Sequence, residues 1–198
     1  MMGMPIEKRR YTVSEYLAFE RSAHERHEYR NGEILAMTGG SYRHSLILAN
    51  LIGELRNALK GKPCRALESN LRVRIPRTPL YTYPDASVIC GEPQIDPNDD
   101  GLETVTNPRV ILEVLSPSTE AYDRGEKFTR YRQLESLEEY VLISQDVPRV
   151  EVFFRQADGT WLFSAFSGLE ARAKLAGLGI EIPLAEIYAG AEAEAPAD

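Results

Sequence analysis

The sequence predicts an α/β (α+β) domain in which helices flank a central mixed β-sheet. Apolar residues recur at helical spacing between Leu48 and Leu59, which is typical of an amphipathic core helix. The run 110–115 is apolar and short enough for a buried central strand, and a helical segment and another strand follow it. The 198 residues, 43% of them hydrophobic and 27% charged, suit one globular domain with its own core.

The N-terminal part is expected to form a short helix and a β-hairpin. Thr12 and Glu15 match a capping box, which predicts that a helix begins after Thr12. Two extended segments, 27–30 and 33–37, flank the dipeptide Asn31-Gly32. This dipeptide favours a type I′ turn because both central residues of that turn need positive φ.

The middle of the chain is expected to hold the main helix and two strands. Ser41 can cap the helix and Gly61 can end it. Apolar residues alternate with arginines over 71–75, which is typical of a half-exposed strand, and 86–90 is read as another strand. The segment 94–108 is rich in Pro, Asn and Asp, which indicates a surface loop.

In the C-terminal half, the apolar strand is followed by a helix from Ser116 to about Leu134. Further strands are expected at 140–143, 150–154 and 161–165. We expect residues 1–188 to form a single domain. Residues 189–198 are predicted to be a disordered acidic tail, because Ala alternates with Glu there and apolar anchors are lacking.

Cysteine usage and the N-terminus bear on the cellular compartment. Cys64 and Cys90 lie far apart and neither belongs to a CxxC pair, so we expect reduced thiols rather than a disulfide or a zinc site. The first ten residues are basic but have no apolar segment behind them, and no stretch approaches the ~20 apolar residues of a membrane-spanning helix. The sequence therefore favours a soluble cytoplasmic protein.

The net charge of −7, from 23 basic and 30 acidic residues, opposes tight nonspecific binding to DNA. A nucleic-acid function would therefore need a local basic face. Ordinary solvated edges of strands and helices would explain the same cations. The candidates are Arg72, Arg74, Arg77, Arg124, Lys127, Arg130 and Arg132.

Two acids next to apolar strands need a chemical explanation. Glu113 interrupts the buried run 110–115, where a carboxylate loses hydration at a cost of several kcal/mol unless a cation or hydrogen-bond donors replace the water. Asp85 stands at the entrance of the strand 86–90. On neighbouring strands the two acids would repel each other unless a divalent metal lay between them, and hard oxygen ligands suit Mg²⁺ or Mn²⁺.

The order of these elements resembles the restriction-endonuclease-like PD-(D/E)xK superfamily. Pro84-Asp85 and Glu113 match the first two parts of that motif, whereas Leu115 stands where its lysine is expected. A closer resemblance covers nearly the whole chain and is carried by 111–119, Glu28, 31–33, His44, 83–85, Asp123, Lys127, Tyr131 and 139–140. By these residues the chain resembles the bacterial Uma-type putative endonuclease family, which implies a restriction-endonuclease-like core.

The resemblance also implies that the missing lysine has moved to the following helix, which points to Lys127. A long amine on a helix beside the Glu113 strand could bring its head near the acids. Gly125 costs that helix ~1 kcal/mol against alanine, which a close backbone approach would explain. The alternative is that Lys127 only pairs with Asp123 at i,i+4 on an exposed face.

The hairpin and the two flanking helices supply weaker candidates. Glu33 lies across the turn from Arg30, so a surface ion pair explains it as well as a role as a third catalytic acid. Glu28 falls on the same face of the hairpin and is a reserve candidate. His44 and Arg124 are weak candidates for substrate binding.

The resemblance implies an Mg²⁺- or Mn²⁺-dependent endonuclease that hydrolyses phosphodiester bonds of DNA. Asp85 and Glu113 would hold the metal, and Lys127 would orient water or stabilise the transition state. The rival hypothesis is a noncatalytic nucleic-acid-binding or protein-binding module that keeps the fold and uses the acids as buried structural pairs. A homodimer is expected if the enzyme cuts duplexes.

Overall fold

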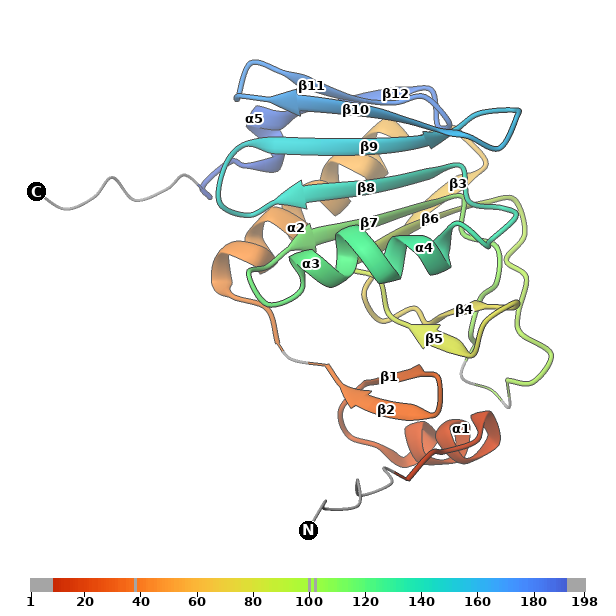
Figure 1. Cartoon of the computed structure of the whole chain (residues 1–198). Coiled ribbons are helices and arrows are strands. Elements are labelled where there is room, and N and C mark those ends of the chain that lie inside the picture. The colour runs from red at the N-terminus through yellow and green to blue at the C-terminus, as the bar shows by residue number, and fades with distance from the viewer. Residues whose placement is uncertain (1–8, 38, 100, 102, 192–198) are drawn as a thin grey trace, which may run out of the picture.

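A six-stranded mixed sheet forms the centre of the computed structural model, which describes residues 9–37, 39–99, 101 and 103–191 (Figure 1). The strand order is β10-β9-β8-β7-β6-β3. β7 and β8 pair in parallel, and the other neighbours are antiparallel. The strands are β3 (Cys64–Glu68), β6 (Ala86–Cys90), β7 (Val110–Leu115), β8 (Glu139–Ser144), β9 (Arg149–Arg155) and β10 (Trp161–Ser167). This architecture confirms the predicted fold class.

Helices cover both faces of this sheet (Figure 1). On one face lies α2 (Tyr42–Ala58), whose buried residues share a core with Val110, Leu112 and Val114 of β7. On the other face lie α3 (Glu120–Tyr122), the π-helical turn η1 (Asp123–Lys127) and α4 (Phe128–Tyr131). Since side chains alternate along a strand, Glu113 and Leu115 point toward this second face. Leu115 is 4% exposed and packs in the core there, as predicted.

A smaller four-stranded sheet, in the order β2-β1-β5-β4, packs against α1 (Val13–Ser22). Its strands are β1 (His27–Arg30), β2 (Glu33–Ala36), β4 (Val73–Ile75) and β5 (Leu80–Thr82). The predicted capping box of Thr12 and Glu15 is present at the start of α1. Asn31 and Gly32 have φ of 50° and 89°, which confirms the two-residue turn of the hairpin.

Several short elements were not predicted from the sequence. These are β3, β5, β11 (Arg172–Leu175), β12 (Ile180–Pro183) and α5 (Leu184–Ile187). Apolar and charged residues alternate in β11 and β12, and this strand period could have signalled them, whereas β5 has only three residues. They form because β3 and β5 add to existing sheets, while β11, β12 and α5 pack into the core beneath α2.

The prediction that Arg72 and Arg74 belong to an exposed basic face is wrong. Arg72 was expected on a half-exposed strand but is 1% exposed, and its guanidinium donates to Thr104 Oγ1 at 2.7 Å and pairs with Asp99 at 3.5 Å. Arg74 pairs with buried Asp96. Val105 of the loop exchanges backbone hydrogen bonds with Arg72 and Arg74, and Asp96 and Asp99 of the loop neutralise these arginines in place of water.

The expectation of reduced thiols is also wrong, because a disulfide joins Cys64 to Cys90. The two residues are 26 positions apart in sequence, but β3 and β6 pair with Cys64 directly opposite Cys90, at a Cα–Cα distance of 3.9 Å. No local spacing signals such a bond, since the strand register alone brings the two sulfurs together.

The C-terminal boundary differs in part from the expected tail. Ala191 is 4% exposed and packs into the main core with Tyr188, although it lies within the segment 189–198 that was predicted to be disordered. Residues 192–198 of that segment lie outside the described residues. None of the helices in the described part of the chain is long and apolar enough to cross a membrane.

Glu139 makes the folded state sensitive to pH. Burial raises the pKa of this carboxyl to about 7, although the backbone N–H of Gly177 donates to it at 3.1 Å. Between about pH 4.5 and pH 7 the unfolded chain loses this proton while the folded chain keeps it. Ionisation therefore favours unfolding, and the stability contributed by the neutral form is lost as the pH rises through this window.

We expect Glu139→Gln to be more stable than the wild-type protein at pH 8, by up to about 3 kcal/mol, and nearly equal to it at pH 4.5. Urea titrations at the two pH values measure this. Glu138→Gln is the matched control, because Glu138 is 39% exposed and pairs with Arg109, and its effect should be much smaller. Equal pH dependence in Glu139→Gln and the wild-type protein would contradict the argument.

Candidate functional site

The backbones of β6 and β7 hold Asp85 and Glu113 side by side. Ala86 pairs with Leu112, so Asp85, one residue earlier, lies beside Glu113. The backbone N–H of Val114 donates to Asp85 Oδ2 at 2.8 Å, and the N–H of Asp85 donates to Glu113 Oε2 at 3.3 Å. The two acids are therefore positioned by neighbouring strands, as their places in the sequence suggested.

Lys127 reaches this pair from η1. Its Nζ lies 2.8 Å from Glu113 Oε1, 3.3 Å from Asp123 Oδ1 and 3.9 Å from Glu28 Oε1. Lys127 is only 6% exposed and Asp123 only 3% exposed. The ion pair between Lys127 and Asp123 thus exists, but it is buried and is one part of a larger cluster rather than a contact on an exposed face.

The helical segment after β7 presents three polar groups to the acids. Asp123, Lys127 and Tyr131 follow at intervals of four and so share one face of the helix. Tyr131 donates its hydroxyl to Glu113 Oε1 at 2.9 Å. Sequence reasoning assigned no such role to Tyr131, although its spacing from Lys127 could have signalled it. A π-helical turn carries Asp123 and Lys127, and such turns are frequent at functional sites.

Gly125, in the same turn, does not mark a close backbone approach. A Cβ built at this position meets nothing within 4 Å. Alanine has the higher helix propensity, so Gly125→Ala should raise the free energy of unfolding by about 1 kcal/mol and the melting temperature by roughly 2–4 °C. Calorimetry would measure this shift, and a destabilised variant would show that the π-helical turn itself requires glycine.

The cluster carries an excess of negative charge. Burial raises the pKa of Glu113 to about 8; Lys127 lowers it, while Asp85 and Asp123 raise it further. Burial lowers the pKa of Lys127, but Glu113, Glu28 and Asp123 together hold it well above its usual value. Lys127 is therefore cationic in the neutral range, and the acids around it outnumber the cations.

His44, in the first turn of α2, contacts Asp85 from the other side. Its Nε2 lies 3.3 Å from Asp85 Oδ2, and this hydrogen bond raises the pKa of His44. Ser41 accepts the backbone N–H of His44 at 3.1 Å, as expected of the predicted cap. Gly40 makes room for the ring, because a Cβ there would lie 2.7 Å from Nδ1. His44 thus adjoins the acids, and its suggested role in substrate binding stays a prediction.

The hairpin brings Glu28 to the cluster, where Thr82 donates its hydroxyl to the Glu28 carboxylate. Glu33 lies opposite Arg30 on the same face of the hairpin, and its suggested catalytic role stays a prediction. Arg124 pairs with Glu120 at 2.7 Å and with Glu151 of β9. Its guanidinium is therefore engaged by acids outside the cluster around Glu113.

The donor set at Asp85 and Glu113 fits a hard divalent cation. Mg²⁺ commonly binds through one or two carboxylates and completes its shell with water and substrate phosphate. In the part of the chain that the structure describes, no group of three or more Asp, Glu, His or Cys side chains is arranged to hold a metal. A metal would therefore depend on the two carboxylates and on oxygens from water or substrate.

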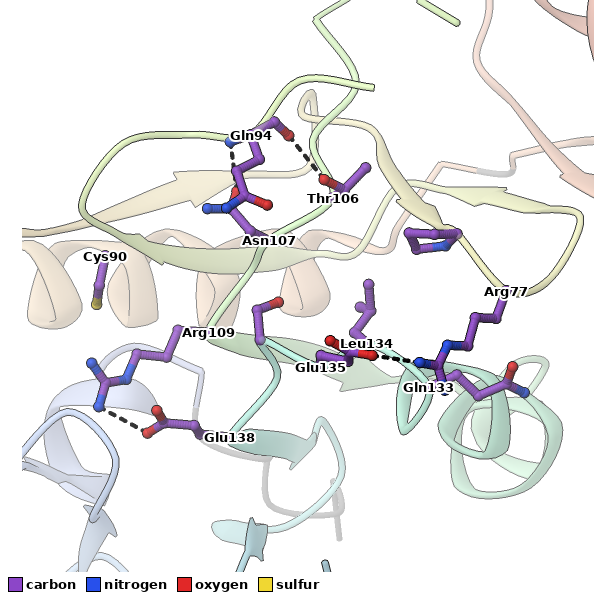
Figure 2. A pocket seen from close by; sticks show the side chains of 12 residues that line it. Arg77, Cys90, Gln94, Thr106, Asn107, Arg109, Gln133, Leu134, Glu135 and Glu138 are labelled. Atoms are coloured by element: carbon purple, nitrogen blue, oxygen red, sulfur yellow. Dashed lines mark hydrogen bonds and ion pairs between the residues drawn. The ribbon is translucent and has the colours of Figure 1, made fainter. Parts of the chain in front are cut away.

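A polar pocket of about 530 Å³ lies at the opposite end of the sheet, where β7 and β8 begin (Figure 2). Arg77 and Arg109 enter it, but Glu135 and Glu138 pair with them. The arginines of this pocket are thus already neutralised by glutamates, and it lacks the uncompensated charge found around Glu113.

Comparisons with known proteins identify the family of the chain. Residues 13–185 match the Uma2 family model, described as "Putative restriction endonuclease". Two uncharacterised proteins of Synechocystis, slr1290 and sll1609, are similar to the chain. The first is 39% identical over 89% of this chain and 90% of its own, and the second is 36% identical over 81% and 89%.

A crystal structure described as a putative nuclease belonging to DUF820, from Anabaena variabilis, superposes with a TM-score of 0.73 at 18% identity. The superposition covers 91% of this chain and 99% of the other. At this identity the likeness shows a shared fold. The family match spans most of the chain, and the chain belongs to the Uma2 family, which is described as "Putative restriction endonuclease".

Proposed function

We propose that this protein is a metal-dependent endonuclease that hydrolyses phosphodiester bonds of DNA at Asp85, Glu113 and Lys127. The observation that carries the proposal is the 2.8 Å contact between Lys127 Nζ and Glu113 Oε1. A lysine from the following helix thereby reaches the acid whose own strand has Leu115 at the usual lysine position. Membership of the Uma2 family supports the same reaction class.

Asp85 and Glu113 would hold Mg²⁺ or Mn²⁺, which when bound polarises a phosphodiester oxygen and lowers the pKa of a water. The chain's own groups prepare that site. The N–H of Val114 orients Asp85, and the hydroxyl of Tyr131 orients Glu113. His44 contacts the Asp85 carboxylate, and its imidazole would be near a phosphate oxygen of a substrate bound at Asp85.

In this proposal Lys127 supplies fixed positive charge to the reaction. A water oxygen bonds to phosphorus and loses a proton to solvent, while the bond from phosphorus to the leaving oxygen breaks and that oxygen takes a proton from solvent. Negative charge grows on the phosphoryl oxygens in the transition state. Lys127 is held by Glu113 and Asp123, so its ammonium offsets that charge without needing to reorganise. Glu33 is the further hairpin acid that could contribute.

One observation favours the rival, a binding module without catalysis. Glu113 Oε1 already accepts from Lys127 and Tyr131, and Oε2 accepts from the backbone of Asp85. These contacts satisfy the carboxylate as a structural group would be satisfied. The two functions differ in their need for metal, because only the nuclease requires a cation at Asp85 and Glu113.

A cleavage assay tests the proposal. Supercoiled plasmid, linear duplex, single-stranded DNA and RNA are incubated with the full chain and Mg²⁺ or Mn²⁺, with a chelator in a parallel set. We expect metal-dependent cleavage of DNA that the chelator abolishes. Binding of the same substrates without cleavage under any metal would favour the binding module.

A further inference from the structure

β10, one edge of the central sheet, has an unusual composition for an edge strand. Residues 160–168 contain no charged side chain and no proline. Leu162 is 56% exposed and Phe163 is 50% exposed. The opposite edge, β3, carries Arg65 and Glu68 instead. In monomeric proteins, edge strands usually carry charged residues or prolines that prevent pairing with another chain. β10 lacks both, so it is the edge of this sheet that is suited to pairing.

The backbone of β10 has outward-pointing N–H and C=O groups that another strand could pair with. Thr160 accepts from Gln156 and Gly168 donates to Pro148, so the even-numbered residues between them bond to β9. The N–H and C=O groups of Trp161, Phe163, Ala165 and Ser167 therefore point outward. Among the residues that the structure describes, none has a backbone hydrogen bond to these groups.

Within the described residues, the nearby hairpin of β11 and β12 forms no ladder with β10. Ala173 and Leu175 of β11 pack into the core shared with α2 and with Val150 and Val152 of β9. β11 runs near β10 (Figure 1) but pairs only with β12, and β10 pairs with β9 alone in the six-stranded sheet.

We propose that two copies of this chain form a symmetric dimer by antiparallel pairing of β10 with β10, centred on Ser164. The outward-pointing residues then meet one another, Trp161 opposite Ser167 of the second copy and Phe163 opposite Ala165. On the other face, Leu162 lies opposite Phe166. Each exposed apolar side chain gains an apolar neighbour, and no like charges meet along the strand.

This dimer is independent of the proposed nuclease activity. Seven strand steps separate the two copies of β7 in the joined sheet, which places the two Glu113 residues roughly 34 Å apart along it. Each copy keeps its own complete cluster around Lys127. Disrupting the dimer should therefore leave metal binding at each site unchanged, and an inactive protein could still dimerise.

Sedimentation velocity on the full chain, from low to high micromolar concentration, tests the proposal. We expect a species of twice the chain mass of 22.3 kDa. The variant F163K/A165K places lysine opposite lysine across the symmetry axis and should be monomeric. The matched variant F163E/A165K places glutamate opposite lysine, keeps lysine opposite Glu151 of β9, and should remain dimeric. Ile95→Lys, which changes another exposed apolar residue, should also leave the dimer intact.

Both double variants lose the ring contact of Phe163 with Phe153 and place lysine at 165 opposite Glu151 on β9, so a dimeric F163E/A165K variant shows that misfolding does not explain a monomeric F163K/A165K variant. A wild-type protein that is monomeric throughout, or a dimer that survives F163K/A165K, would overturn the proposal. Loss of the dimer in F163E/A165K as well would overturn the register.

Hydrogen exchange tests the wild-type chain without any substitution. In the dimer the amides of Trp161, Phe163, Ala165 and Ser167 are hydrogen-bonded, so their exchange should slow at least tenfold between low and high protein concentration. The amides of Leu162 and Ser164, already bonded to β9, should change far less. Rapid, concentration-independent exchange of the four outward amides would refute the pairing.

Discussion

Replacing Lys127 with methionine is expected to lower metal-dependent cleavage of DNA by roughly 10²–10³-fold while metal binding stays nearly intact. Lys127 contributes charge beside Glu113 and no ligand oxygen, so its loss should raise the barrier and leave the donors for the cation in place. Single-turnover cleavage at saturating metal measures the first quantity, and calorimetric titration with Mn²⁺ measures the second.

Lys127→Arg should restore little of this activity. The guanidinium is larger and planar, and the buried space between Glu113, Asp123 and Glu28 holds a compact ammonium. A variant with arginine that cleaves at the wild-type rate would show that any cation at this position suffices.

Asp123→Asn is the control that separates a catalytic from a structural lysine. The change removes one partner of Lys127 but keeps the 2.8 Å contact with Glu113, so cleavage should fall far less than in Lys127→Met. Equal and small losses of activity in the two variants, with equal small changes in melting temperature, would mean that Lys127 is structural and that another group supplies the charge.

Glu113→Gln is expected to abolish both cleavage and the stabilisation that Mn²⁺ gives the wild-type protein. A ligand at one hundred times its dissociation constant stabilises the folded state by about 2.7 kcal/mol, which corresponds to a rise of roughly 5–10 °C in the melting temperature of a domain of this size. The glutamine variant should show no rise, because a neutral amide is a poor ligand for a hard cation.

The fold of this variant should survive. Burial raises the pKa of Glu113 to about 8, so the folded state already tolerates a neutral group at this position. Glu28→Gln is the matched control, since it changes a neighbouring glutamate that is not a proposed ligand and should keep the metal-dependent rise. If millimolar Mn²⁺ does not change the melting temperature of the wild-type protein, the proposed metal site is wrong and the binding module is favoured.

Short-range chemistry made much of the fold predictable from the sequence. The capping box at Thr12, the turn at Asn31-Gly32 and the helix after Ser41 depend on neighbours within a few residues. The central strand with Glu113 was recognisable because an acid inside a continuous apolar run stands out against its surroundings. The burial of this strand follows from the hydrophobicity of its other residues.

The family resemblance, rather than periodicity, directed attention to Lys127. Tyr131 follows Lys127 by four residues, so its place on the same helix face could have been read from the spacing. Only the tertiary structure decided that Glu28 of the hairpin contacts Lys127 and that His44 of α2 contacts Asp85. These contacts span many residues in sequence, and each depends on the angle at which a helix or hairpin packs on the sheet. Propensity and spacing do not encode that angle.

The sequence by itself determined the mixed α/β class, the main helix and hairpin, and the two acids that require a cation or donors, because each follows from local geometry or from the cost of burying charge. The tertiary structure decided the disulfide between Cys64 and Cys90, the burial of Arg72 and the open edge at β10. Each of these depends on which strands become neighbours and in what register, and that choice is made by the packing of the whole core.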